Sequence, residues 1–577
     1  MTTTAGGLLL VAAVLLPFVG VLAGIALGGR AARWVAAVTI AAGTGNAIAT
    51  ALAFGRADAA LVYLLGNWPP PLGIALRADG LAVVMMLAVT AVILGIAVYA
   101  WRSFSTPAGA REARAPLVFW TLLLAIWGSL NLVFVSGDLF TLYVALELLT
   151  FAAVPLVSLD GRGETLRAAL RYLLFALLGS MLYLLGAVLL YGVYGTLDIT
   201  LLAAAIRAEP AVLAAAALMT AGLLAKTALF PLHLWLPPAH AGAPAAASAI
   251  LSGLVIKGSW FLVIRLWFDV LPGVVTMPSA QLLAGLGAAA ILVGNVVALR
   301  QRRLKLLVAY STVAQIGYLF LMFPLAFDAA GTFLVRGAAL DAGMLQAISH
   351  ALAKAAMFMA AGIFYHALGH DRITDLAGAG RALPITLATF VLAGLALLGL
   401  PPGGAFVAKK LLLDAAAGSG QWWWATVLHA GGVLTAGYVV LVLAFAVRRA
   451  ERPLERLEPV SRLAEMAALV LALGSLLLGF IAAGSHLPDA LSGAFTLREF
   501  GAVLLAIAGG AVLAAALALR PPPLPAANAL FALARPATSA LGGLLVSLDW
   551  LLRKWAVAGV ALIAVALGFA LTLLWGR

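Results

Sequence analysis

The stretch that decides the class of this protein is Gly137–Val157, which reads GDLFTLYVALELLTFAAVPLV. It is long and apolar enough to cross a bilayer as a helix, and it carries Glu147 near its centre. An ionisable side chain at such a depth costs at least ~2.5 kcal/mol on insertion scales, so it is retained mainly for function. Glu147 is the only carboxylate deep inside a predicted membrane span. The sequence therefore predicts a membrane protein in which Glu147 has a functional role.

Basic side chains also lie within apolar segments further along the chain. They are Lys226, Lys257, Lys354 and Lys409, together with His233 and His350. One acid followed by a series of bases through a membrane protein is typical of a proton path.

The composition fixes the fold class as an all-α polytopic membrane protein. Of the 577 residues, 64% are hydrophobic and 10% are charged, and such a chain must cross a bilayer many times as helices. The absence of cysteine excludes disulfides, iron–sulfur clusters and thiolate metal sites. We therefore expect no cofactor, and any redox centre must lie on another chain. The net charge of +13 comes from basic residues scattered through short loops, which indicates a membrane rather than nucleic acid as the partner.

Apolar runs of about twenty residues predict roughly sixteen transmembrane helices. They centre near residues 17, 43, 90, 125, 148, 179, 220, 256, 290, 314, 355, 397, 435, 473, 509 and 565. Alternate loops hold 23 basic residues, against five in the loops between them. Since Lys and Arg concentrate on the cytoplasmic side, both termini are expected on the other side. The apolar N-terminal stretch follows no basic segment, which argues against a cleaved signal peptide.

Two predicted spans are interrupted by proline. The seventh, Ala225–Pro244, contains Pro231, and the twelfth, Leu397–Lys410, contains Pro401 and Pro402. Proline removes an amide donor and clashes with the preceding turn, so both helices must open there. Interrupted helices at corresponding positions of two halves indicate an ion site in a transporter built from inverted repeats.

Five motifs, in this order along the chain, carry a family resemblance. They are GDLFTLYVALELL, LLAKTALFPLHLWLPPAHAGAPAAASAILSGLVIKGSWFLVIRL, LLVAYSTVAQIGY, ISHALAKAAMFMAAGIFYHA and GLPPGGAFVAKKLLL. Over roughly residues 75–480 the sequence resembles the antiporter-like proton-channel subunits of respiratory complex I, membrane-bound hydrogenases and Mrp cation/proton antiporters. The resemblance implies a core of about fourteen helices with two inverted five-helix repeats, and a line of charges halfway across the membrane.

With this resemblance, the chain divides into four predicted regions. Residues 1–110 form the first three helices, residues 111–270 the first repeat (helices 4–8), and residues 275–450 the second, inverted repeat (helices 9–13). Residues 460–577 form helices 14–16, with an interfacial segment at 520–555.

The resemblance also implies roles for individual residues. Glu147 matches the family's acid of the fifth helix, Lys226 its lysine before the break, and Lys257 the bridging lysine of the eighth helix. The polar pair of the eleventh helix and the terminal charge of the twelfth are matched by His350, Lys354 and Lys409.

Some of these residues also have a physical interpretation that does not depend on the resemblance, and so do His233, His240 and Lys305. Lys226 lies five residues before Pro231, where water can reach it, and the four-residue spacing of the eleventh-helix pair places both side chains on one helix face. His233 and His240 flank the seventh break, where each either takes part in the path or hydrogen-bonds a freed carbonyl. Lys305 is interpreted as cytoplasmic loop charge.

Three features favour one branch of the family. Glu147 disfavours the quinone-proximal complex I paralogue, which usually carries lysine there, and Lys409 disfavours the middle paralogue, which usually carries glutamate. Only about 35 residues, Arg520 to Lys554, separate the last two spans. They reach at most ~50 Å as a helix, shorter than the lateral helix of the distal paralogue. The fit that remains is the D-type component of an Mrp antiporter.

The leading functional hypothesis is a proton-translocating subunit of a multisubunit Na⁺/proton antiporter in a bacterial inner membrane, with no enzymatic activity of its own. Its partners would be other membrane subunits, and Na⁺ would move through those, because hard cations prefer several oxygen ligands. One alternative is a proton-pumping subunit of complex I or a membrane-bound hydrogenase. Another is the membrane subunit of an energy-coupled inorganic carbon uptake system.

Overall fold

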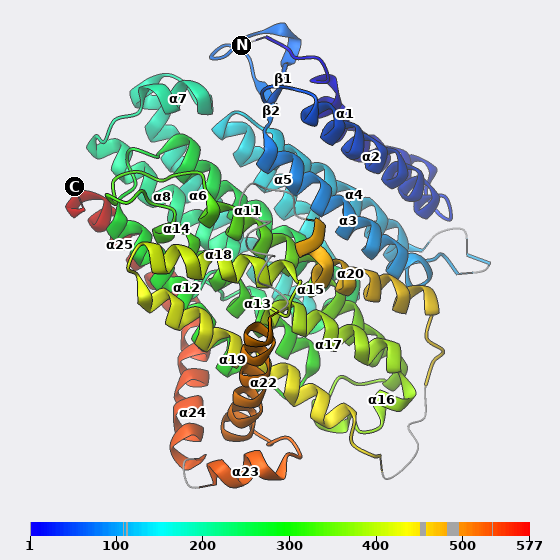
Figure 1. Ribbon diagram of the computed structural model, residues 1–577. Helices are drawn as coiled ribbons and strands as arrows, with labels where there is room; N and C mark the ends of the chain where they lie inside the picture. The colour runs from blue at the N-terminus through cyan, green and yellow to red at the C-terminus, as the bar shows by residue number, and fades with distance from the viewer. Residues whose placement is uncertain are drawn as a thin grey trace.

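A computed structural model of the chain describes residues 2–107, 109–110, 113–450, 457–481, 496–532 and 535–576 (Figure 1). Arg111, Arg452 and Arg456, which the loop-charge count includes, lie outside the described residues.

The described part of the chain contains fifteen helical segments long and apolar enough to cross a membrane. Those formed by one continuous helix are α1 (Leu8–Leu27), α2 (Ala32–Gly55), α3 (Gly80–Ser103), α4 (Arg114–Val135), α5 (Leu139–Val157), α6 (Gly163–Tyr194), α8 (Pro210–Thr227), α12 (Met277–Leu299), α15 (Ala338–Leu368), α19 (Trp422–Ala446), α20 (Arg462–Ile481), α22 (Leu497–Leu517) and α25 (Trp555–Trp575). Two crossings are composite. The eighth joins α10 (Ala245–Ile250), the π-helical η2 (Leu251–Val255), α11 (Ile256–Ile264) and the π-helical η3 (Arg265–Val270), and the tenth joins α13 (Leu304–Tyr318) and α14 (Met322–Leu325).

The twelfth predicted span consists of two shorter helices, α17 (Pro384–Leu398) and α18 (Gly404–Gly418). With it, the count of about sixteen spans and the all-α fold class are confirmed. The remaining elements are the 18-residue helix α24 (Arg535–Leu552) and a set of short ones: the antiparallel strands β1 (Leu61–Leu64) and β2 (Ala75–Ala78), α7 (Ile199–Ala205), α9 (Leu236–Gly242), α16 (Ala379–Ala382), α23 (Pro525–Phe531), η1 (Leu65–Asn67) and η4 (Ile373–Asp375). The division into four regions stays a prediction.

Both predicted breaks are present, and the chain supplies partners for the backbone groups that they free. In the seventh crossing, α8 ends at Thr227 and α9 begins at Leu236. The indole Nε1 of Trp235 donates to the carbonyl of Ala225 at 3.0 Å. In the twelfth, the amide of Gly479 in α20 donates to the carbonyl of Pro402 at 3.1 Å. Irregular backbone at membrane depth is tolerated when it is buried and partnered in this way.

The core of the bundle is formed by the helices that carry the predicted relay. The eighth crossing is buried along its whole apolar length, and α13 and α15 are buried along nearly all of theirs. By contrast, α1 and α2 lie at one edge of the molecule (Figure 1) and expose much of their surface. The charged residues of the central helices are therefore surrounded by protein rather than by lipid.

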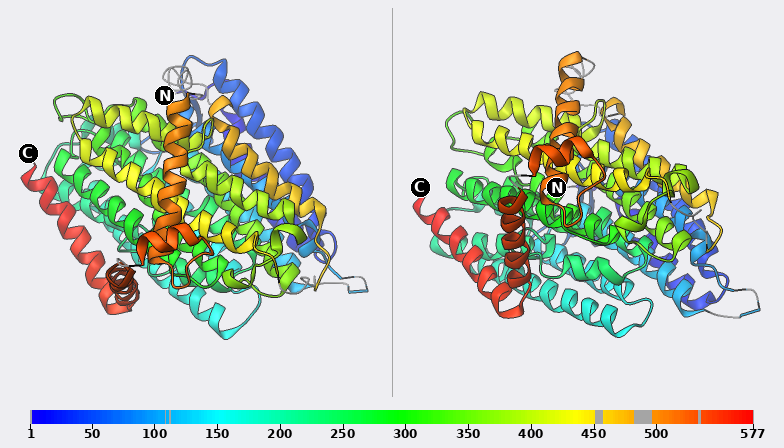
Figure 2. Two further views of the ribbon diagram at one scale, coloured as in Figure 1. Left: turned by 60° about the horizontal axis from the view of Figure 1, so that its bottom comes forward. Right: turned by 90° about the horizontal axis from the view of Figure 1, so that it is seen from below.

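The penultimate helix α24 does not follow the direction of the bundle. Figure 2 shows it running across the long axes of the crossing helices, and it packs against α12, α22 and α25. It is not among the helices long and apolar enough to cross a membrane.

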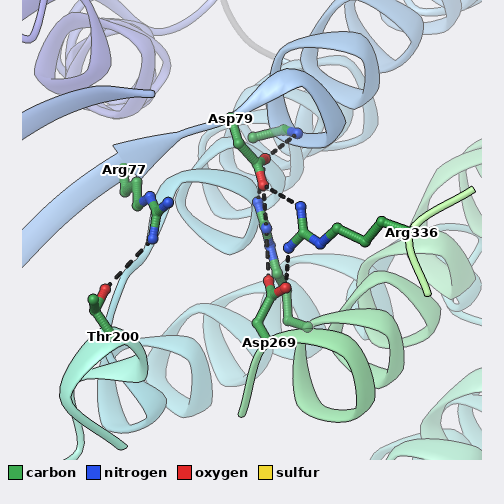
Figure 3. A network of polar contacts seen from close by, with 7 residues as sticks. Arg77, Asp79, Thr200, Asp269 and Arg336 are labelled. Carbon is green, nitrogen blue, oxygen red and sulfur yellow. Dashed lines mark hydrogen bonds and ion pairs between the residues drawn. The ribbon is translucent and has the colours of Figure 1, made fainter. Parts of the chain in front are cut away.

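A network of charged side chains lies near the N-terminal end of α3 (Figure 3). Arg265 donates to both carboxylate oxygens of Asp79 at 2.6 Å and to Asp269 at 2.8 Å, and Arg336 pairs with both acids. Burial opposes the charge of Asp79, but the hydrogen bonds and charge of Arg265 outweigh it and hold the pKa of Asp79 well below its usual range. The network joins α3, the end of the eighth crossing and the segment before α15.

Candidate functional site

The structure brings Glu147 of α5 and Lys226 of α8 into direct contact. Lys226 Nζ lies 3.1 Å from Glu147 Oε1, and the side chains are 12% and 6% exposed for Glu147 and Lys226. The ammonium also donates to Thr150 at 2.9 Å and to Ser180 at 2.5 Å. Two neutral hydroxyls therefore hold Lys226 in addition to the carboxylate.

Lys226 occupies the last turn of α8, directly before the break. The packing that brings it close to α6 depends on glycine. A Cβ atom at Gly222 would lie 2.3 Å from the carbonyl of Gly179, so the two backbones touch there. Gly222 and Lys226 are one turn apart and face the same neighbour.

Polar groups continue from Lys226 to the eighth crossing. Thr227 donates to Ser259 at 2.9 Å, and Lys226 and Ser259 line a common cavity of about 10 Å³, about the least space that admits one water molecule. Ser259 lies two residues after Lys257 on α11.

Lys257 and His350 meet at the centre of the bundle. Lys257 Nζ lies 2.5 Å from His350 Nδ1 and donates to the carbonyl of Ser252 at 2.6 Å. Lys257 is 1% exposed and His350 is fully buried. The carbonyl of Ser252 belongs to the π-helical η2, and π-helical turns of this kind frequently occur at functional sites. A lysine facing an imidazole nitrogen at this distance can exchange a proton with it.

Lys354 lies one helical turn after His350 and is also fully buried. Its Nζ donates to the hydroxyl of Ser311 and to the carbonyl of Val308, the latter at 3.4 Å. It also sits over the ring of Tyr438, 5.8 Å from the ring centre. No carboxylate contacts Lys354 within the described ranges.

A chain of amides links this position to Lys409. Gln315, one turn after Ser311, accepts from Gln346 at 3.2 Å and donates to Thr435 at 3.2 Å. Gln346 and Lys409 line a common cavity of about 10 Å³. Lys409 lies in α18, in the first half of that helix after the second break. The charged positions therefore lie along a buried polar axis from Glu147 to Lys409, in which hydrogen bonds and small cavities connect some neighbours and turns of helix separate the others.

The two histidines of the seventh crossing have different surroundings. His240 is fully buried and stacks on Phe358 with ring centres 4.6 Å apart, and in the described part of the chain neither ring nitrogen has a hydrogen-bond partner. His233 pairs with Asp549 of α24 at 2.8 Å. Neither imidazole therefore caps a freed carbonyl of the break.

The interpretation of Lys305 as loop charge is wrong. It is 7% exposed, donates to the carbonyl of Ala243 and lines a cavity of about 750 Å³. Arg102, Arg162 and Arg303 also line this cavity, and they belong to the basic loops that the sequence predicts on the cytoplasmic side. The position beside a basic loop concealed this burial, since Lys305 is already the second residue of the apolar helix α13.

The polar residues that connect the charges were missed by sequence reasoning. Ser180, Ser311, Gln315 and Gln346 are common residue types in helices. For the last three, only a spacing of four residues from a charged or polar neighbour offered a signal, and Ser180 offered none. Asp549 offered none, because its partner lies 316 residues away in the sequence.

The fold and the charges buried within it are those of a membrane ion-translocating subunit. Residues 136–435 match the family described as NADH:quinone oxidoreductase/Mrp antiporter, TM. The match spans more than half of the chain, and the chain belongs to this family.

Proteins similar to this chain include components of both complexes in the family description, NADH:quinone oxidoreductases and Na⁺/H⁺ antiporters. The N-type component of an NADH-quinone oxidoreductase from Desulforudis audaxviator is 35% identical over 72% of this chain and 84% of its own length. The D-type component of a Na⁺/H⁺ antiporter from Alkalihalophilus pseudofirmus is 30% identical over 67% of this chain and 76% of its own length.

A solved chain in the Mrp complex of a Dietzia species shares the fold, with a TM-score of 0.73, 24% identity, and coverage of 88% of this chain and 100% of that one. A chain of an archaeal membrane-bound sulfane sulfur reductase gives a TM-score of 0.72 at 24% identity, with 87% and 99% coverage.

Proposed function

We propose that this chain translocates protons as a membrane subunit of a multisubunit monovalent cation (Na⁺)/proton antiporter. The observation that carries the proposal is the buried ion pair of Glu147 and Lys226, from which the polar axis runs through the core to Lys409. Ionisable groups buried together within a membrane protein commonly form ion pathways or proton relays.

In this mechanism the ion pair acts as the loading point. Protonation of Glu147 weakens its attraction for Lys226, and the lysine then gives a proton toward Ser259 and Lys257 through water in the adjoining cavity. Lys257 exchanges that proton with His350, and Lys354 receives it one turn further on. The amides of Gln315 and Gln346 guide water or a proton to Lys409, where it leaves. The reverse order gives flux in the other direction.

The choice of an antiporter rests on Glu147, Lys409, the short segment before α25, and the similarity to the D-type component of an antiporter. Na⁺ would pass through partner subunits, because the axis offers amines and imidazoles rather than the oxygen cage that a hard cation requires. The proposed location is a bacterial inner membrane, with both termini on the non-cytoplasmic side.

A second function is favoured by the similarity to the N-type component of an NADH-quinone oxidoreductase. In that case electron transfer in a partner chain would drive the same proton path. The subunits that copurify with this chain distinguish the two: flavin and iron–sulfur proteins would overturn the antiporter assignment and leave the path intact.

The proton path itself is tested in inverted vesicles from cells that lack their own antiporters, with the chain and its partner subunits expressed together. Addition of Na⁺ should dissipate the pH gradient, and Glu147→Gln and Lys226→Ala should each abolish this response. Glu209→Gln is the matched control. Glu209 is an exposed residue directly before α8, the helix that carries Lys226, and its side chain makes no capping hydrogen bond. Undiminished exchange in both site variants would refute the path.

A further inference from the structure

The penultimate helix α24 places a carboxylate at the break of the seventh crossing. Asp549 is 1% exposed, and its Oδ1 lies 2.8 Å from Nε2 of His233. His233 lies two residues after Pro231, between α8 and α9. An acid on a helix that runs across the bundle thus reaches the opened turn of a broken helix.

Two further donors hold this carboxylate. The hydroxyl of Tyr310 in α13 donates to Oδ2 of Asp549 at 2.8 Å, and Nε of Arg553 donates to the same atom at 3.0 Å. Burial disfavours the charged carboxylate, but the hydrogen bond from His233 and the charge of Arg553 outweigh burial and hold the pKa of Asp549 below its usual value. Asp549 is therefore ionised, and Arg553 balances its charge.

The geometry leaves one nitrogen of His233 available. With Nε2 donating to Asp549, the other ring nitrogen, Nδ1, is a bare acceptor, and it is buried without a partner in the described part of the chain. The ring is held against Phe230, with centres 5.3 Å apart. A carboxylate bound to one nitrogen fixes the tautomer of a histidine and stabilises a proton that arrives at the other.

We propose that His233 and Asp549 form a proton-exchanging pair in which α24 supplies the carboxylate that lets His233 take up and release a proton. This inference rests on the proposed function. The proton binds to Nδ1 from water in the opened turn and returns to water, while Asp549 stays ionised and keeps its contacts. Asp549 is a positioning residue, since it touches the nitrogen opposite the one that exchanges. The C-terminal segment thus acts on its own chain.

The test measures proton flux of the assembled complex in proteoliposomes. Asp549→Asn keeps the size of the side chain and removes its charge, so flux should fall by at least about tenfold, a modest value for the loss of proton-transfer assistance. Asp549→Glu, which restores the charge, should recover part of the flux. Ser547→Ala is the matched control, since Ser547 is exposed on the same helix and, among the residues that the structure describes, its hydroxyl bonds only the carbonyl of Gly543. It should leave flux unchanged.

A double variant shows whether His233 and Asp549 act as a pair or only pack against each other. His233→Gln should reduce flux as much as Asp549→Asn does, and the two changes together should cost no more than either alone, because coupled residues are not additive. Additive losses, or normal flux in assembled Asp549→Asn, would overturn the pair. If Asp549→Asn does not assemble, as judged by size-exclusion chromatography, His233→Gln decides, since it leaves the carboxylate with Tyr310 and Arg553.

Glu147→Gln is measured in the same preparation. Normal flux in that variant refutes the proposed function as a whole. Loss of flux in Glu147→Gln together with normal flux in Asp549→Asn rejects only the pair.

Discussion

Glutamine at position 147 should destabilise the protein, and a second substitution should reverse that loss without restoring transport. Removing one partner of a buried ion pair costs about 3–5 kcal/mol, because the other charge stays buried without compensation. Lys226 keeps hydrogen bonds to Thr150 and Ser180, and Glu147 is 12% exposed. We therefore expect the lower end of this range, about 3 kcal/mol, for Glu147→Gln.

The double variant Glu147→Gln/Lys226→Met removes both charges and fills the same space. Its thermal unfolding midpoint in detergent should return close to that of the wild type, since two neutral side chains of similar size replace the pair and no uncompensated charge stays buried. Proton flux should stay absent in both variants. A double variant as unstable as the single one would refute the idea that an uncompensated Lys226 causes the loss. Flux in the stable double variant would show that the pair is structural only.

Two predictions concern the scaffold. Asp79→Asn should cost about 1.5–3 kcal/mol at neutral pH, because Arg265 loses its charged hydrogen bonds to Asp79 while Asp269 remains as its partner. The pKa of Asp79 lies below its ordinary 3.8 in the folded state, so its contribution is present above about pH 4 and is lost as the pH falls further; the unfolding midpoint of the variant should therefore depend less on pH below 4. Gly222→Ala would place a Cβ 2.3 Å from the carbonyl of Gly179, which should cost about 1–3 kcal/mol and lower flux by displacing Lys226. Gly192→Ala in α6, where a Cβ meets nothing within 4 Å, is its control, and equal unfolding midpoints of the two variants would contradict the close-packing argument.

The membrane architecture could be predicted because the bilayer restricts which residues a crossing segment can contain. A crossing needs about twenty apolar residues, and a proline within one must open the helix. The pattern around Pro231 and Pro401 therefore indicates both breaks without any knowledge of the fold. The charges at Glu147 and Lys226 stand out for the same reason, since an ionisable group in an apolar run is rare.

The connections between the charges could not be predicted in the same way. Gln346 and Ser180 are ordinary helix residues, and their importance depends on which neighbouring helix they face. Lys305 seemed to belong to a loop because it follows a run of basic and polar neighbours, but tertiary packing buries it. Asp549 lies on a helix that an apolar count assigns to the interface, and only the folded chain shows that it reaches His233.

Replacement of Lys354 shows whether protons pass along the axis from Glu147 to Lys409. Lys354 is fully buried, and its ammonium bonds only a hydroxyl and a carbonyl in the described ranges. Lys354→Met therefore removes a charge without leaving an unpaired acid, and the complex should assemble normally. Proton flux in proteoliposomes containing this variant should fall at least about tenfold relative to the wild type. Wild-type flux in the assembled variant would mean that protons do not follow this axis.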